Sequence, residues 1–306
     1  MNRIGVVSEN WREWRSNEKG LDSFLHKDFD KVGYFSWGDV SSNVAAEAFV
    51  NGECVKSVPL SGFDFIYLSS LGAIEGKYDR VVNFIERLED VDGEVVNSPI
   101  TMINNFDKGY LLTLQDSGVP VVPTTDARNM DFEDVVNLYG DRKKVVKPRY
   151  FGERMEGVLT LGEDERVESQ DSWNKYVSEM GGSVLVQPFV DEIYEGERSF
   201  TYVGDSFSHG VYRARDGWKE NSALVFEAVD LSAPERGICE NILEMWPDRK
   251  GVTRFDFIGG IRNPRISEVE MVNPNLWIGR GLDGVDENFG NAFLGYLREY
   301  KSSNSQ

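Results

Sequence analysis

Two short acidic segments near the C-terminus carry the side chains most able to do chemistry. Asp256 alternates with apolar residues within 254–258, and Glu268 and Glu270 do so within 266–272. Alternate residues of a β-strand point to opposite faces, so the three carboxylates would share one face. Such a set of oxygens suits a hard cation such as Mg²⁺. The same alternation is typical of a solvated antiparallel strand, so both interpretations stay open at this point. The residues expected on the opposite face are Phe255, Phe257, Val269 and Met271.

Basic residues in the middle of the chain could bind phosphate. A lysine at a strand end, followed by a glycine-bearing loop such as 151–157, can contact phosphate oxygens while backbone N–H groups cover others. A solvated strand edge explains Arg142 and Lys143 but not Lys147, which lies between a valine and a proline. Lys108 is a second candidate, because a cation at the start of a predicted helix opposes the helix dipole and needs another reason to be there. The five cations of 142–149 are Arg142, Lys143, Lys144, Lys147 and Arg149.

Composition excludes several classes of protein. The 306 residues carry a net charge of -19, which argues against a nucleic acid or an anionic membrane as partner. No apolar run approaches the roughly 18 residues of a membrane span, and residues 1–8 read as a strand, so we expect a cytoplasmic protein. Cys54 and Cys239 have no metal-ligand spacing. With His26 and His209 as the only histidines, a catalytic triad is poorly supported.

The hydrophobic pattern indicates an α/β protein. In the first hundred residues short apolar strands alternate with helical segments, which predicts a small layer with a mainly parallel sheet. Asp107 is a candidate N-cap for a helix ending near Gly118. Further helices are expected at 78–88, 132–139, 173–180 and 288–300. Strands are expected at 4–7, 32–35, 65–68, 95–96, 144–147, 158–161 and 184–187, and the last hundred residues read mainly as strands.

One apolar strand could hold a nucleobase. Residues 184–190 run into Pro188, after which backbone groups are free for a partner other than a sheet strand. Main-chain amide and carbonyl groups there could bind an adenine edge. Glu197, which follows a glycine, could accept hydrogen bonds from ribose hydroxyls, although taken alone it is better explained as a plain turn residue.

Seven segments, in this order, resemble the ATP-grasp superfamily and within it the glutathione synthetase-like branch. They are 104–112, 118–124, 146–148, 187–190, 196–197, 254–256 and 268–274. Residues 37–39 resemble the tryptophan–acid element that follows the second strand there. The resemblance implies an α/β (α+β) fold with a Rossmann-like pre-ATP-grasp domain at 1–100. A two-subdomain ATP-grasp fold would follow at 101–185 and 186–306, the second subdomain holding the metal.

The resemblance also implies residue roles. Phosphate-binding residues would be Lys108 and Lys147, adenine-binding residues Gln187, Phe189 and Val190, and the ribose-binding residue Glu197. Ligands of Mg²⁺, with Mn²⁺ as an alternative ion, would be Asp256, Glu268 and Glu270. Residues near the γ-phosphate and acyl phosphate would be Arg213, Arg215, Lys219 and Arg254. The sequence departs from the family in two places: loop 151–157 carries two acids, and Asn273 stands where relatives often carry an acid.

The implied activity is an ATP-dependent ligase that joins a carboxylate to an amine through an acyl phosphate. Its partners would be ATP and a small-molecule or peptide carboxylate with its amine, and relatives are commonly dimers. Candidate substrate contacts are Trp277, Arg280 and the loop 279–284. The alternatives are an ATP-grasp kinase that releases a phosphorylated product and an ATP-binding regulatory protein without turnover.

Overall fold

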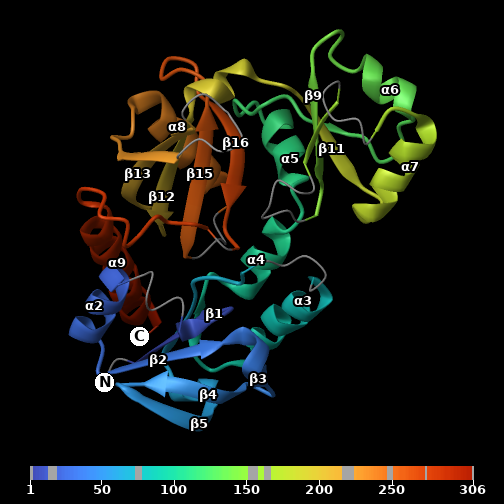
Figure 1. The fold of residues 1–306 in the computed structure, drawn as a ribbon. Coiled ribbons are helices and arrows are strands. Elements are labelled where there is room, and N and C mark those ends of the chain that lie inside the picture. Colours follow the sequence, from blue (N-terminus) through green and yellow to red (C-terminus); the bar gives the residue numbers. More distant parts are fainter. Residues whose placement is uncertain are drawn as a thin grey trace.

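The computed structural model describes residues 3–12, 19–72, 78–150, 158–161, 167–215, 224–246, 251–272 and 274–304. Within these residues the strands form three separate sheets, which Figure 1 shows one below and two above. The predicted mixed α/β class is confirmed, while the division at residues 100 and 185 stays a prediction. None of the described helices is both long and apolar enough to cross a lipid bilayer.

The first sheet combines a parallel core with an antiparallel extension. Its parallel strands are β1 (Arg3–Ser8), β2 (Lys31–Ser36), β6 (Phe65–Leu68) and β7 (Glu94–Val96). The antiparallel strands are β3 (Val40–Ser41), β4 (Val44–Val50) and β5 (Glu53–Pro59). The prediction of a mainly parallel sheet therefore missed the β4–β5 hairpin. Its turn, Asn51-Gly52, has positive φ at both residues, as a two-residue hairpin requires. The helices in this part are α2 (Lys19–Asp28) and α3 (Tyr78–Arg87).

The second sheet is antiparallel and covered on one face by helices. Its strand order is β10–β9–β11–β8, and alternate residues of β9 and β11, among them Val146, Val184 and Val186, pack in one cluster with Trp173. Because side chains alternate along a strand, Lys147 and Gln187 point away from this cluster. The elements are β8 (Thr125–Asp126), β9 (Lys144–Pro148), β10 (Leu159–Leu161), β11 (Val184–Pro188), α6 (Phe132–Asn137) and α7 (Gln170–Glu179).

The third sheet carries both acidic segments on adjacent strands. Its order is β14–β13–β12–β15–β16, all antiparallel, and Asp256 of β15 lies opposite Glu268 of β16. The predicted apolar face is confirmed, since all four expected residues lie in one buried cluster with Ile242 and Leu111. The carboxylates therefore occupy the opposite face. The elements are β12 (Glu197–Val203), β13 (Ser206–Arg215), β14 (Leu224–Ala228), β15 (Val252–Ile258), β16 (Arg265–Glu270) and α8 (Ala233–Met245).

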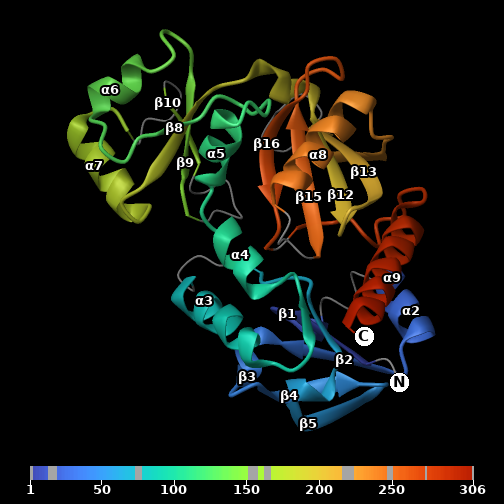
Figure 2. The ribbon, with the colours of Figure 1, turned by 180° about the vertical axis from the view of Figure 1, so that it is seen from behind.

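Helix α5 (Tyr110–Asp116) lies between the second and third sheets in both upright views (Figures 1 and 2). Its predicted N-cap is wrong: Gly109 holds that position. Asp107 instead accepts a hydrogen bond from the Gly109 N–H at 2.7 Å and pairs with Arg149 at 2.6 Å. The Asp107 carboxylate therefore ties the start of α5 to the end of β9.

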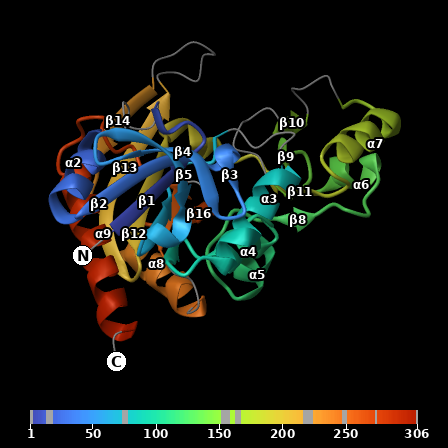
Figure 3. The ribbon, with the colours of Figure 1, turned by 90° about the horizontal axis from the view of Figure 1, so that it is seen from below.

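Two helices connect the first sheet to the third. Helix α9 (Val285–Asn304) buries Phe289 and Phe293 in one cluster with Ile4 of β1 and Val252 of β15, and Figure 3 shows α9 next to α2. Helix α4 (Pro99–Asn105) follows Asn97, whose side-chain amide donates to the Val252 carbonyl at 2.6 Å. The carboxyl end of β7 is thus fixed at the edge where β15 begins.

Candidate active site

Lys108 and Glu268 form the ion pair at the centre of the charged site. The Lys108 ammonium donates a hydrogen bond to Oε1 of Glu268. Burial acts to lower the pKa of Lys108, but Glu268, Tyr110 and Glu270 outweigh it, so the pKa lies above that of free lysine. Burial likewise acts to raise the pKa of Glu268, yet Lys108, Arg254 and Lys147 bring it to about 2. Both side chains are therefore charged at neutral pH.

Lys147 projects from β9 of the second sheet toward the same cluster. Burial and the neighbouring Lys108 lower its pKa to about 8, against the opposing pull of Glu268 and Glu197. Loss of hydration and a neighbouring cation both make the protonated form of Lys147 less stable. Lys108 and Lys147, which come from different parts of the fold, together form a positive pair suited to a polyanion such as a triphosphate.

Arg254 and Asp256, two residues apart on β15, form a bidentate ion pair. Arg254 Nε donates to Asp256 Oδ1 at 2.9 Å, and Nη2 donates to Oδ2 at 2.8 Å. Asp256 is 1% exposed, so this pair is desolvated. Burial acts to lower the pKa of Arg254, but Asp256, Glu270 and Glu268 raise it. Arg254 therefore remains ionised.

Arg213 of β13 bridges two carboxylates. Its Nη2 atom lies 3.0 Å from Glu197 Oε2 and 3.5 Å from Asp256 Oδ2. Burial raises the pKa of Glu197, and Asp256 and Glu268 raise it further, while Arg213 and Arg254 oppose them. Four of the predicted site residues, from three strands, thus contact one another: Glu197, Arg213, Arg254 and Asp256.

The donor chemistry of the acidic residues fits Mg²⁺, because all three are anionic oxygen ligands on adjacent strands. In this structure each carboxylate already has another partner: Asp256 has the arginines, Glu268 has Lys108, and Glu270 accepts from the Val272 N–H at 2.8 Å. Among the described residues no three acidic, histidine or cysteine side chains are grouped closely enough to hold a metal ion. A metal ion held by these three carboxylates would displace some of these partners.

The predicted adenine-binding residues lie at the end of β11, on the same sheet as Lys147. The buried Gln187 amide donates to Thr124 Oγ1 at 2.9 Å. The Phe189 N–H donates to the Lys143 carbonyl at 2.7 Å, so this amide is already hydrogen-bonded. Val190 precedes a short 3-10 turn, Asp191–Glu195. The structure therefore places these residues at the end of a strand that pairs with the strand of Lys147, with the Phe189 N–H already engaged.

Several predicted residues are not in the cluster or fall outside the described part of the chain. Lys219, Asn273 and the loop 151–157 lie outside it, as does the side chain of Arg215. Arg280 is exposed, with its guanidinium 4.7 Å from the Phe226 ring centre. Trp277, a candidate substrate contact, is 3% exposed and packs against Val211 and Val285.

Two residues that hold the site in place were not predicted. The Tyr110 hydroxyl accepts from the Val269 N–H at 3.0 Å, and the Asn105 amide oxygen accepts from the Met271 N–H at 2.8 Å. Both bonds pin the acidic strand β16 to the chain on either side of Lys108. The available signal was that both residues lie within 104–112, a segment in which only Lys108 was assigned a role in the site.

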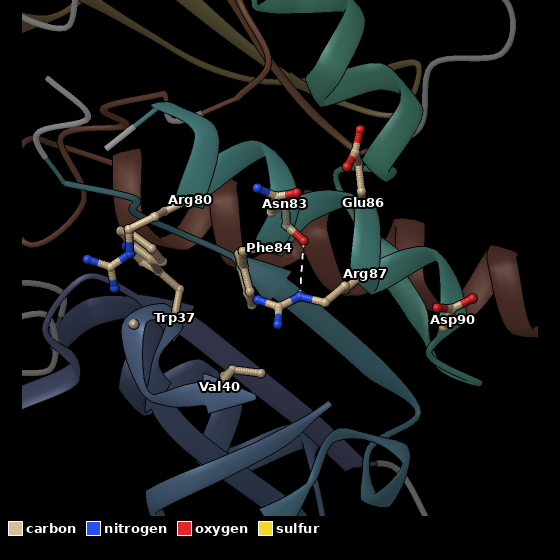
Figure 4. A pocket seen from close by; sticks show the side chains of 9 residues that line it. Trp37, Val40, Arg80, Asn83, Phe84, Glu86, Arg87 and Asp90 are labelled. Atoms are coloured by element: carbon tan, nitrogen blue, oxygen red, sulfur yellow. Dashed lines mark hydrogen bonds between the residues drawn. The ribbon is translucent and has the colours of Figure 1, made fainter. Parts of the chain in front are cut away.

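A surface pocket of about 540 Å³ lies away from this cluster, between α3 and the turn after β2 (Figure 4). None of the predicted catalytic, nucleotide or metal residues lines it. Trp37 lines it, while its indole N–H donates to the Leu71 carbonyl at 3.1 Å. Within the described residues, the charged cluster brings together cations and carboxylates of the second and third sheets, whereas this pocket lies beside the first sheet.

The described fold is that of the ATP-grasp ligases, and the predicted resemblance to them is confirmed. No protein-family model matches the chain. It is similar to the cycloserine biosynthesis protein DcsG of Streptomyces lavendulae, with 24% identity over 254 residues, 75% of this chain and 82% of DcsG. The crystal structure of the D-cycloserine synthetase DcsG matches with a TM-score of 0.69 and 19% identity, covering 95% of this chain and 99% of DcsG.

Two other solved ATP-grasp ligases share the fold. PsnB, complexed with a phosphomimetic variant of its minimal precursor, Mg and ADP, matches with a TM-score of 0.63 and 17% identity over 96% of this chain and 98% of PsnB. The D-alanine–D-alanine ligase from Bacillus anthracis complexed with ATP matches with a TM-score of 0.62 and 14% identity, covering 99% of each chain.

Proposed function

We propose that this protein is an ATP-dependent ligase that joins a carboxylate to an amine through an acyl phosphate. The observation that carries the proposal is the convergence of Lys108 and Lys147 with the carboxylates and arginines of the third sheet. Phosphoryl transfer needs cations that bind the phosphates and anionic ligands that bind the metal. The two lysines would supply the cations, and the nearby carboxylates would supply the metal ligands. The similarity to DcsG, PsnB and D-alanine–D-alanine ligase supports the same reaction class.

The residues of the chain would divide the work as follows. Lys108 and Lys147 hold the phosphates of ATP, and the end of β11 holds the adenine. Arg213 and Arg254 neutralise the charge on the transferring phosphoryl group and orient the substrate carboxylate. Bound Mg²⁺, held by Glu268 and Glu270 with Asp256, would neutralise charge on the phosphate oxygens.

The reaction balances without a protein nucleophile. A carboxylate oxygen attacks the γ-phosphorus, the bond to the β-phosphate oxygen breaks, and ADP leaves. The amine then attacks the acyl carbon, and inorganic phosphate departs with one oxygen of the original carboxylate. The amine proton passes to solvent. A substrate of the amino-acid or peptide class is consistent with the ligases named above.

Hydroxylamine tests the first half-reaction without knowledge of the natural amine. A panel of amino acids, hydroxy acids and short peptides, incubated with Mg²⁺, ATP and hydroxylamine, should yield a hydroxamate and ADP for at least one carboxylate. Lys147→Ala and Glu268→Gln should lower this rate by roughly 100-fold or more. Lys175→Ala, an exposed lysine of α7, is the matched control and should retain it.

Other outcomes select the alternatives. A stable phosphorylated product that resists hydroxylamine would indicate a kinase. Binding of Mg²⁺ and ATP without ADP release across the whole panel would indicate a regulatory protein. Light scattering on the purified chain addresses the proposed homodimer independently of activity.

A further inference from the structure

Trp277 lies against both arginines of the site. The guanidinium carbon of Arg254 is 5.4 Å from the centre of the Trp277 ring, and that of Arg213 is 5.7 Å from it. Both distances lie within the range of cation–π attraction, which is strongest for tryptophan and grows as the pair loses water. One ring therefore contacts two cations that come from different strands.

The backbone fixes this ring firmly. Trp277 has φ of 54°, in the left-handed region that side chains other than glycine rarely adopt. Its neighbours Leu276 and Ile278 are buried in the cluster that contains Ile4 of β1, and its N–H donates to Asn275 Oδ1 at 3.1 Å. A strained conformation persists only where its surroundings hold it, and such residues concentrate at functional sites. The first sheet thus anchors the segment that carries the ring.

The two arginines are like charges that lie close together, and several groups around them offset their repulsion. Both contact the buried Asp256 and so share its charge, and Arg254 Nη2 also lies 3.8 Å from Glu268 Oε2. Glu197 takes part of the charge of Arg213, and the Asn275 carbonyl accepts from Arg254 Nη1 at 3.4 Å. The Trp277 ring adds attraction for both cations without adding a carboxylate that would repel phosphate.

We propose that Trp277 is a positioning residue that holds Arg213 and Arg254 side by side for the transferring phosphoryl group. This inference rests on the proposed function. It differs from the candidate role of Trp277 as a substrate contact, since the ring is buried and lies against the two arginines. Trp277 would act only through the two guanidinium groups. Its loss should therefore weaken binding of the transferring phosphoryl group and leave the affinity for ADP nearly unchanged.

Calorimetry with a mimic of the transferring phosphoryl group tests this. Binding of ADP and Mg²⁺ is measured with and without aluminium fluoride for the unmodified protein, Trp277→Phe and Trp277→Met. We expect fluoride to tighten ADP binding by roughly 100-fold in the unmodified protein. Trp277→Met should lose roughly tenfold or more of that gain, while Trp277→Phe, which keeps an aromatic face, should keep most of it.

The readouts separate the possible failures. Affinity for ADP and Mg²⁺ alone should stay within about threefold in both variants, which shows that the site is folded. A full fluoride gain in Trp277→Met would overturn the positioning role. If Trp277→Met does not fold, loss of most of the gain in a folded Trp277→Phe would overturn the aromatic argument, and a retained gain supports it. No fluoride gain in the unmodified protein would instead contradict the proposed function.

Discussion

The Lys108 ammonium is hydrogen-bonded to the Glu268 carboxylate, 160 positions further along the chain. In the proposed function each of these two side chains has a different partner. Lys108 would bind phosphate, and Glu268 would bind Mg²⁺. Nucleotide and metal should therefore bind together, because either one alone leaves one charge of the pair without a partner.

We expect Mg²⁺ to strengthen ADP binding by roughly tenfold or more, and Glu268→Gln to abolish most of this effect. The glutamine removes the charge that Mg²⁺ requires but keeps the shape of the side chain. Calorimetric titration of ADP with Mg²⁺ or with EDTA measures the difference. Glu179→Gln, on the exposed face of α7, is the control. An unchanged Mg²⁺ effect in Glu268→Gln would remove this residue from the metal site.

Nucleotide binding should weaken as pH rises above about 8, the pKa of Lys147 in the free protein. Phosphate binds the protonated lysine, so loss of that proton lowers the affinity by up to tenfold per pH unit. Titrations of ADP and Mg²⁺ at pH 7, 8 and 9 should show the decline. Lys147→Arg keeps its charge over this range, and its affinity should stay nearly flat. A decline of equal size in Lys147→Arg would assign the effect to another group.

His209 should make stability fall in mild acid. It is buried, with Nδ1 2.7 Å from Ser208 Oγ and Nε2 3.1 Å from the Leu276 carbonyl, and burial lowers its pKa to about 4. In the unfolded chain His209 binds a proton near pH 6.5, whereas in the folded chain it binds one only near pH 4. Stability is therefore complete above pH 6.5 and should drop by about 2 kcal/mol toward pH 4.5. Urea unfolding of His209→Gln, compared with the unmodified protein at pH 7 and 4.5, checks this; an identical acid loss in the variant would contradict it.

Glu235 should be a large stability determinant far from the chemistry. Its side chain is 1% exposed, with Oε1 2.5 Å from Arg198 Nε and Oε2 accepting from the Ser232 N–H at 3.1 Å. Glu235→Ala should cost about 3 kcal/mol, because it leaves Arg198, whose side chain is 14% exposed, without its counterion. Urea unfolding of Glu235→Ala, Arg198→Met and the double variant measures the coupling. A cost below about 1 kcal/mol for Glu235→Ala would show that the pair is dispensable.

The sequence predicted the elements whose apolar and polar residues alternate regularly along the chain. The alternation in 254–258 and 266–272 was enough to place Phe255 inside and Asp256 on the other face, because strand periodicity is a property of neighbouring residues. Helix α8 was missed although Ser232 and Glu235 form a capping box at its start. The β4–β5 hairpin was missed although Asn51-Gly52 is a strong turn signal. In both cases the sequence contained a signal from which the element could have been predicted.

The contacts of the site could not be read from the sequence in the same way. The motif order suggested that Lys108 and Glu268 share a site, but not that they bind each other. Trp277 contacts the arginines from a backbone position with positive φ, and its neighbours Leu276 and Ile278 are buried in the cluster that contains Ile4. Such a conformation depends on tertiary packing, which no local pattern encodes.

Isotope transfer tests the central claim most directly. A carboxylate that supports turnover is labelled with ¹⁸O at both oxygens, and the released phosphate is analysed by mass spectrometry. Ligation through an acyl phosphate predicts one ¹⁸O atom in each phosphate, because the oxygen that attacks the γ-phosphorus departs with it. Phosphate without ¹⁸O would mean that the carboxylate is never phosphorylated, and it would contradict the proposed function.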